Sequence, residues 1–285
     1  MTDATRLLQS VQRMPVLAVS GASITLNSSA LRRLVDVTTG ASDSAVTLPT
    51  SGVRDGDMLF TRKADTGAGK ANVNSDTAWL LTQGDVVQWM YTNSAWWALD
   101  WRISPVRQVF LSTAYYTRPP LSRYVYPKLI GAGGGGGGGR KGAAGSVRCG
   151  GGGGQAGGYS ERLFRAELLG APLTQVQVAI GGFGAGGSSQ TANSTNGNSG
   201  VAGSATSFGT LLVAQGGSLG NGGTSSGGSG GSVNGVGIIS AVSGASASAT
   251  GAAGVQPQSH GAIAASGSSG GGITSGNVDS AGAAG

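Results

Sequence analysis

The stretch GAGGGGGGGRKGAAGSVRCGGGGGQAGGY, residues 131–159, decides how this chain of 285 residues folds. It contains two glycine runs and opens a region that holds 49 of the 56 glycines of the chain. Glycine makes up about a third of that region, against about 7% in ordinary proteins. All five tryptophans lie before Ile130. We take this change in composition as a domain boundary.

A region so rich in glycine and serine is by default disordered, but two features favour order here. Its charge is low, and strand-like pieces interrupt the glycine. These pieces are YSERLF (159–164), TQVQVAI (174–180), TSFGTLLVAQGG (206–217) and VGIISAV (236–242). A glycine run in a left-handed helix of three residues per turn points its N–H and C=O groups outward. Without side chains such helices approach closely enough to bond one another. We expect a lattice of polyglycine helices held by short strands across residues 131–285, and expect residues 243–285 to be disordered or ordered only in an oligomer.

Residues 16–103 are predicted to be all-β, because short β-branched and aromatic runs alternate with Gly, Asn, Asp and Ser. Their size fits a small β-sandwich. The clearest unit is a hairpin with its turn at 92–94. On the returning strand, strict alternation places Trp97, Leu99, Trp101 and Ile103 on the core face and leaves Trp96 exposed. The tryptophans could instead form a sugar-binding platform.

Two further segments complete the predicted organisation. Residues 1–15 are expected to form a short helix with Leu7, Val11 and Met14 on one face, either as a frayed end or as a peg that inserts into, or trimerises against, a larger assembly. Residues 104–130 form a stiff connector rich in proline and tyrosine, with strand character at 106–111.

The residues needed for catalysis or cofactor binding are nearly missing from the sequence. Cys149 and His260 are the only cysteine and histidine, and Glu161 and Glu167 the only glutamates. The GxGxxG match at 131–136 continues into glycine and opens no helix, so it does not predict a dinucleotide site. Asp55 and Asp57 flank Gly56 and are expected to form turns. We expect a protein that is not an enzyme and holds no metal or other cofactor.

The net charge of +6 is spread thinly along the chain. The group of residues most like a basic patch is Arg140, Lys141 and Arg148, which we expect to be solubilising charges. We therefore predict no nucleic-acid partner. The high pI still favours weak attraction to anionic surfaces such as bacterial polysaccharide. No secretory signal or membrane span is visible, and we expect synthesis in a cytoplasm.

Two stretches resemble parts of bacteriophage tail fibres. Residues 46–100 are similar to a fibre module with the pattern V-x-L-P…G-D, then G-D-x-V…Y…W. The matching residues are Val46, Leu48, Pro49, Gly56, Asp57, Gly84, Asp85, Tyr91 and Trp97. Residues 126–217 resemble the glycine-rich domain of phage tail fibre and receptor-binding proteins. Residues 150–159, 178–187 and 203–217 follow its motifs in order, although Ala179 and Ile180 replace simpler residues.

This resemblance implies a homotrimeric fibre in the virion tail, made in the host cytoplasm. The fibre would attach through its N-terminal region to other tail or baseplate proteins and turn its glycine-rich domain to a host glycan or outer-membrane protein. No contact residue carries over from the family. On physical grounds the loop aromatics Tyr159, Phe183 and Phe208 are candidate receptor contacts, although each could equally plug the space between glycine helices. The alternatives are a connector, baseplate or decoration protein without host contact, a secreted adhesin, and a depolymerase.

Overall fold

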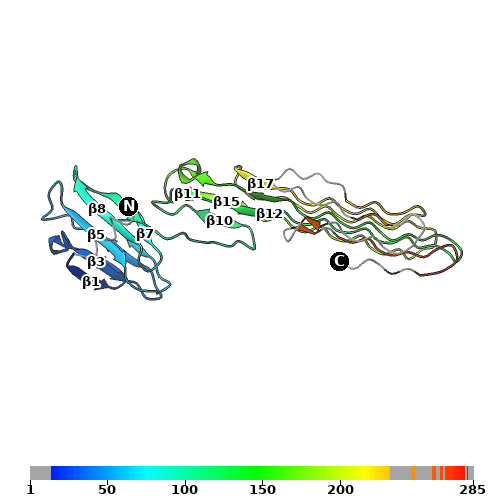
Figure 1. Ribbon diagram of the computed structural model, residues 1–285, viewed down its shortest axis with the longest axis horizontal. Helices are drawn as coiled ribbons and strands as arrows, with labels where there is room; N and C mark the ends of the chain where they lie inside the picture. Colours follow the sequence, from blue (N-terminus) through cyan, green and yellow to red (C-terminus); the bar gives the residue numbers. More distant parts are fainter. Residues whose placement is uncertain are drawn as a thin grey trace. The chain divides into compact units, whose positions relative to one another are not determined.

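The computed structural model describes residues 14–231, 245–247, 259–260, 264–265, 267–279 and 281. The chain divides into two units. The first comprises Met1–Val109, Thr117–Arg123 and Leu169–Thr174, and the second comprises Phe110–Tyr116, Tyr124–Leu168 and Gln175–Gly285. The described residues are all-β, with only the short 3-10 helices η1 (Ser28–Ala30) and η2 (Ala166–Leu169). This confirms the predicted all-β class (Figure 1).

The first unit contains two sheets. The five-stranded sheet has the order β1 (Val16–Ser20), β3 (Leu34–Thr38), β5 (Met58–Lys63), β8 (Val86–Thr92) and β9 (Ala95–Arg102). The four-stranded sheet has the order β2 (Ser23–Thr25), β4 (Ser44–Thr47), β6 (Ala71–Val73) and β7 (Ala78–Leu80). From β1 to β6 the chain alternates between the sheets, so β1, β3 and β5 pair in parallel, as do β2, β4 and β6. Each crossover between parallel neighbours therefore contains a strand of the other sheet.

Both sheets contribute side chains to one hydrophobic core. The cluster includes Val35 and Val37 of β3, Val46 of β4, Val73 of β6, Leu80 of β7 and Trp89 of β8. Trp89 is fully buried, and its Nε1 donates a hydrogen bond to Thr61 Oγ1 at 2.9 Å. The indole N–H is thus satisfied inside an apolar interior, as a buried polar group requires.

The prediction for the returning strand of the hairpin is wrong for half of β9. Trp96 is buried at 7% exposure, and its Nε1 donates to Pro49 O at 2.7 Å, whereas Trp97 is 59% exposed. The cause is a register shift beside Gln88 and Trp89, where β9 carries one extra residue. A bulge reverses the alternation of faces beyond it. Trp101 and Ile103, past the bulge, do pack against the core as predicted, but Leu99 does not.

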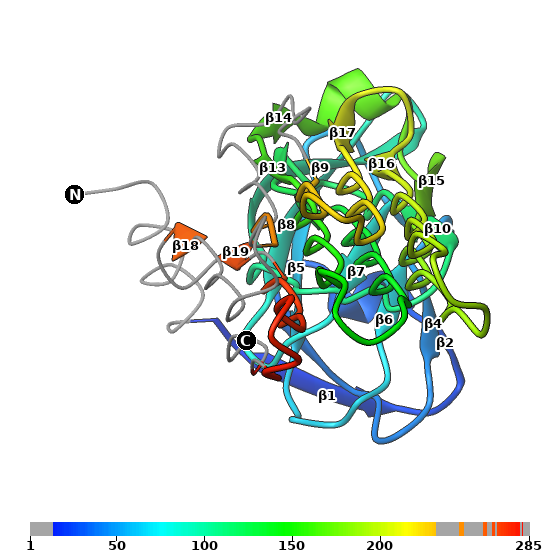
Figure 2. The ribbon, with the colours of Figure 1, turned by 90° about the vertical axis from the view of Figure 1, so that its right-hand side faces the viewer.

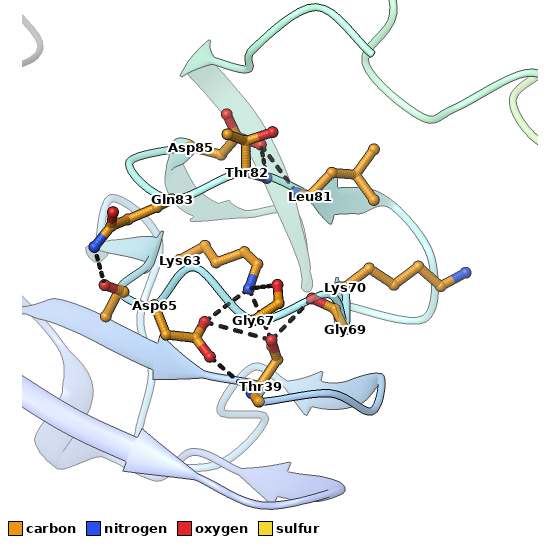
Figure 3. A network of polar contacts seen from close by, with 12 residues as sticks. Thr39, Lys63, Asp65, Gly67, Gly69, Lys70, Leu81, Thr82, Gln83 and Asp85 are labelled. Atoms are coloured by element: carbon orange, nitrogen blue, oxygen red, sulfur yellow. Dashed lines mark hydrogen bonds and ion pairs between the residues drawn. The ribbon is translucent and has the colours of Figure 1, made fainter. Parts of the chain in front are cut away.

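A buried ammonium group ties two connecting loops of the first unit together (Figure 3). The Lys63 side chain is fully buried, and its Nζ donates to Thr39 Oγ1 at 2.8 Å, Asp65 Oδ1 at 2.7 Å and Gly67 O at 3.0 Å. Asp65 Oδ2 accepts from the Gly40 amide at 2.7 Å. The hydrogen bonds from Lys63 and Gly40 hold the pKa of the Asp65 carboxyl well below its usual range. The loops around residues 40 and 67 are therefore fixed by charge-assisted bonds.

Aspartates close the turns of the first unit. Asp85 is buried, and its carboxylate accepts from the amides of Leu81, Thr82 and Ser104 at 2.7–2.9 Å. The predicted turn residues Asp57 and Asp55 accept from the amides of Arg54 and Asn93, respectively. Their predicted role in turns is confirmed. Gly56 has φ +90°, in the left-handed region that favours glycine.

The second unit contains one four-stranded and three two-stranded sheets among its described residues. The larger sheet has the order β10 (Ala114–Thr117), β15 (Gln175–Ala179), β16 (Thr206–Phe208) and β17 (Leu212–Ala214). The small sheets pair β11 (Tyr124–Val125) with β14 (Phe164–Arg165), β12 (Lys128–Ile130) with β13 (Tyr159–Glu161), and β18 (Ser259–His260) with β19 (Ala264–Ala265). The expected strands at 159–164, 174–180 and 206–217 are present. The strand expected at 106–111 is not, and the segment 236–242 lies outside the described residues.

Between these strands run five extended segments, which we call the glycine threads: residues 131–141, 149–158, 181–188, 195–204 and 215–224. They run side by side away from β12 and β17 (Figure 1) and coil about their own axes when seen from the end (Figure 2). Their backbones bond one another with a period of three. The amides of Gly134, Gly137 and Arg140 donate to Gln155, Gly152 and Cys149 at 2.9–3.0 Å, and those of Gly135, Gly138 and Lys141 donate to Val201, Asn198 and Thr195 at 2.8–3.1 Å.

Three residues per turn is the repeat of the polyproline II helix, so the hydrogen bonds match the expected packing of backbone on backbone. The carbonyls of thread 131–141 also accept bonds from threads 181–188 and 215–224. This thread therefore bonds to all four others. Part of the last stretch of the chain joins the same arrangement, since the amides of Gly267 and Gly270 donate to Gly154 and Gly151.

Glycine is needed in the threads for close approach. A Cβ on Gly134 or Gly137 would lie 2.0 Å from the carbonyl oxygen of Ser218 or Asn221. No glycine of thread 131–141 has a left-handed φ, so conformation is not the reason. The side chain of Gln155, at 2% exposure, lies buried among these backbones, and its Oε1 accepts a hydrogen bond from the Ser218 amide at 2.9 Å.

Candidate functional site

The three predicted contact aromatics lie in three different environments. Phe208 on β16 is buried at 3% exposure and packs against Tyr116, with ring centroids 5.6 Å apart. Phe183 lies on thread 181–188 and is 86% exposed. Tyr159 on β13 is half-buried. Phe208 is thus an interior residue of the four-stranded sheet, while Phe183 and Tyr159 are accessible to a partner.

Tyr159 belongs to a cluster on the paired strands β12 and β13. Its hydroxyl donates to Glu161 Oε2 at 2.6 Å, and Lys128 Nζ lies 3.2 Å from the same oxygen. The ammonium group of Lys128 also lies 4.9 Å from the centroid of the Tyr126 ring. Register places Lys128 opposite Glu161 and Ile130 opposite Tyr159, so these four residues share the face of the sheet turned away from Leu129.

Hydrogen bonding sets the charges of this cluster. Bonds donated by Tyr126, Tyr159 and Lys128 lower the pKa of the Glu161 carboxyl to about 2. The same bonds to Glu161 raise the pKa values of both tyrosines and of Lys128. At neutral pH the carboxylate is therefore ionised and fixes two tyrosine rings and one ammonium group.

The resulting surface combines apolar area with fixed polar groups. Tyr126 is 50% exposed and Ile130 64% exposed, and Tyr124, on the preceding strand β11, is 59% exposed. Amphipathic rings held in fixed positions bind a partner with little loss of conformational entropy. We call the surface formed by Tyr126, Lys128, Ile130, Tyr159 and Glu161 the tyrosine face.

The threads and the tyrosine face both lie within a region that matches a known family. Residues 109–285 match the family model described as the glycine-rich domain. The chain belongs to this glycine-rich domain family. No curated protein matches the chain.

In this member of the glycine-rich domain family, two of the three predicted attachment residues, Leu7 and Val11, lie outside the described residues. Met14 is half-buried and packs against a small cluster of Leu34, Phe60 and Val86 in the first unit. These three alternate with the core residues of the same strands, so Met14 lies on the outer face of the five-stranded sheet.

The described part of this glycine-rich protein shows no group of three or more His, Cys, Asp or Glu side chains that could hold a metal ion. Cys149 is buried within thread 149–158. Among the same residues no helix is long and apolar enough to cross a membrane.

Sequence reasoning missed Tyr126, Lys128 and Glu161 as partners of Tyr159. A signal was present, because YPKL (126–129) and YSE (159–161) both alternate aromatic or charged residues with small or apolar ones. Two strands that alternate in this way combine their polar faces when they pair. What the sequence could not supply was the pairing of β12 with β13 across the two glycine runs.

Proposed function

We propose that this chain is a structural and adhesive tail fibre of a bacteriophage virion. It would attach to other tail or baseplate proteins through its N-terminal region and contribute to recognition of a host glycan or outer-membrane protein. The finer features of the proposal are a β-sandwich collar in the first unit, polyglycine helices in the second, and a homotrimer. The proposal includes no catalytic turnover.

The observation that carries the proposal is a glycine-rich domain whose interior is backbone and whose surface presents aromatic side chains. The hydrogen-bonded threads form an extended arrangement whose interior is mostly backbone, which suits a fibre at a particle surface. The tyrosine face and Phe183 leave apolar rings accessible on that body. Exposed apolar patches rimmed by polar groups commonly mark binding sites, and three copies would strengthen a weak site through multivalency.

Binding of the fluorescently labelled full chain to a panel of bacterial cells tests this function. We expect saturable binding to cells of the host. Phe183→Ala and Tyr159→Ala should weaken it, while Ser226→Ala, in an exposed turn of the same unit, should not. A mass in solution near three chain masses would support the trimer. The absence of binding to any cell type, or release of oligosaccharides from the surface, would contradict the proposal.

The connector alternative has its own supporting observation. Met58, Trp97 and Leu99 of the five-stranded sheet are 39%, 59% and 50% exposed. Met90 pairs with both Met58 and Trp97, so an apolar row crosses β5, β8 and β9. Such a row suits contact with another structural protein.

Virions that lack residues 131–285 separate the two functions. Intact particles that fail to adsorb would support the adhesive fibre, and failed assembly would support the connector.

A further inference from the structure

Three of the five cations in residues 131–285 lie at one end of the glycine threads. Arg140 and Lys141 end the first thread, and Arg148 directly precedes the second. The Arg140 amide donates to Cys149 O, and Lys141 and Arg148 form bridges to Thr195 and Ile273. The turn at 142–147 is therefore bound to two other chain segments, and we call Arg140, Lys141 and Arg148 the basic end.

Each side chain of the basic end is held by a neutral oxygen. Arg140 Nη1 donates to Asn196 Oδ1 at 2.6 Å, Lys141 Nζ to Thr191 O at 2.7 Å, and Arg148 Nη2 to Asn277 Oδ1 at 2.9 Å. The four ion pairs found in the described part of the chain use other cations. In addition, Arg140 Nε is buried and has no hydrogen-bond partner there. The three positive charges are thus positioned but not neutralised.

The acids of the second unit lie mostly elsewhere. Glu161 is on β13 at the opposite end of thread 149–158, about 40 Å from Arg148 at the rise of this helix type. Glu167 is on η2, beyond β14. Of these acids only Asp279 lies near the basic end, because it forms a β-bridge with Ile273, which is also the β-bridge partner of Arg148. Three cations against one carboxylate leave this end positive.

We propose that the basic end binds an anionic polysaccharide of the host surface. The inference rests on the proposed function, because it assigns a ligand class to host attachment. Guanidinium groups match carboxylate or phosphate oxygens in pairs, and Arg148 is oriented by a partner that does not neutralise it. The neighbouring loop SSQTANST (188–195) supplies hydroxyl and amide groups suited to sugar hydroxyls. A group of only three cations beside such a loop favours a polysaccharide over a nucleic acid, which is usually bound by a larger basic surface.

The test compares two double variants of the full chain with equal loss of charge. Lys141→Gln/Arg148→Gln removes two cations of the basic end, and Arg162→Gln/Arg165→Gln removes two exposed cations near β14. The probes are immobilised polygalacturonate, which carries carboxylates, and poly(glycerol phosphate), with uncharged dextran as the reference. Thermal unfolding checks that both variants fold.

We expect binding to at least one anionic probe and none to dextran. Binding should fall several-fold when the ionic strength rises from about 0.05 to about 0.2 M, because exposed charges are screened. The basic-end variant should bind about tenfold more weakly, the control within twofold of the unchanged chain, and Arg148→Lys within about threefold. Carboxylate and phosphate sources are distinguished by which probe binds.

Several results would overturn the inference: equal binding by the basic-end variant, equal binding to dextran, or tighter binding to duplex DNA of matched charge. Cell binding separates this inference from the proposed function. If the unchanged chain and the basic-end variant bind cells equally, the inference fails and host attachment stands. If the unchanged chain binds the anionic probes but no cell, the proposed function fails.

Discussion

The two units of this chain build their interiors from opposite parts of the polypeptide. The first unit packs side chains from two sheets into one apolar core around Trp89. The glycine threads of the second unit pack backbone against backbone, with carbonyl oxygens where side chains would otherwise lie. A side-chain core is stabilised mainly by removing apolar surface from water. The glycine threads depend instead on hydrogen bonds and close approach, and they restrict the many conformations open to unfolded glycine.

The largest expected effect is in the side-chain core. Trp96→Ala should destabilise the first unit by about 3–5 kcal/mol, because it leaves a cavity and an unpaired Pro49 carbonyl. Trp97→Ala, on the exposed neighbour, should change stability by less than about 1 kcal/mol. Calorimetric unfolding measures both. Equal losses from the two variants would contradict the register shift in β9, and a matching loss in the second unit would contradict two separate interiors.

Replacing a thread glycine by alanine adds one methyl group and tests whether the glycine threads pack backbone against backbone. Gly137→Ala places its Cβ 2.0 Å from Asn221 O, so the threads must separate, at a cost of about 3 kcal/mol from overpacking and weakened hydrogen bonds. Hydrogen exchange of the thread amides and the unfolding transition of the second unit report this loss. Unchanged protection of the Gly137 and Gly138 amides in the variant would be incompatible with the threads as described.

Acid should affect the units unequally. The Asp65 pKa is depressed in the folded state, so its stabilising effect is complete above the unfolded value of about 3.9 and is lost as pH falls below it. We expect the unfolding temperature of the first unit to fall below about pH 4, and to fall less in Asp65→Asn. The pKa of Glu161 is also lowered in the folded state, so its stabilising effect is likewise lost in acid. Because the Glu161 side chain is more exposed to solvent, we expect a smaller fall in the unfolding temperature of the second unit. An unchanged acid response in Asp65→Asn would assign the effect to other carboxylates.

The smallest expected effect is a gain in stability rather than a loss. A Cβ on Gly133 meets nothing closer than 3.7 Å, from Gln155 O, and its φ is not left-handed. Gly133→Ala should therefore stabilise the second unit by up to about 1 kcal/mol, by restricting the unfolded chain. The unfolding temperatures of this variant and of Gly137→Ala form a matched pair. A clear loss at position 133 would mean that the thread is more crowded there than the structure shows.

Sequence reasoning predicted the second unit better than the first. The strand-like interruptions and the glycine runs indicated short strands and backbone packing, because both depend on local composition. The parallel pairing of β1, β3 and β5 depends on contacts far apart in the chain, and no local pattern encodes it. The bulge in β9 is likewise set by how Trp96 and Trp101 both reach the core.

One readable signal was overlooked in the threads. Glycines recur every third residue at 181, 184 and 187, at 197, 200 and 203, and at 217, 220 and 223. A Cβ at each would lie within 1.8–2.3 Å of a backbone oxygen of a neighbouring thread. The tyrosine face could be predicted only through Tyr159, because its other members depend on strand pairing. Leu7 and Val11 remain predictions.

A repeat of three residues also creates an ambiguity that ordinary cores do not have. A thread displaced along its axis by one turn would find donors and acceptors in the same positions, so hydrogen bonding alone cannot fix its alignment. The Gln155 side chain removes that freedom, because its Oε1 has a partner only at Ser218. The fixed register between β12 and β13, which adjoin two of the threads, is a second constraint on their alignment. The buried Gln155 amide and the paired strands β12 and β13 therefore fix the alignment of the threads. A force applied along the threads would act on these contacts before it broke the repeating hydrogen bonds between the backbones.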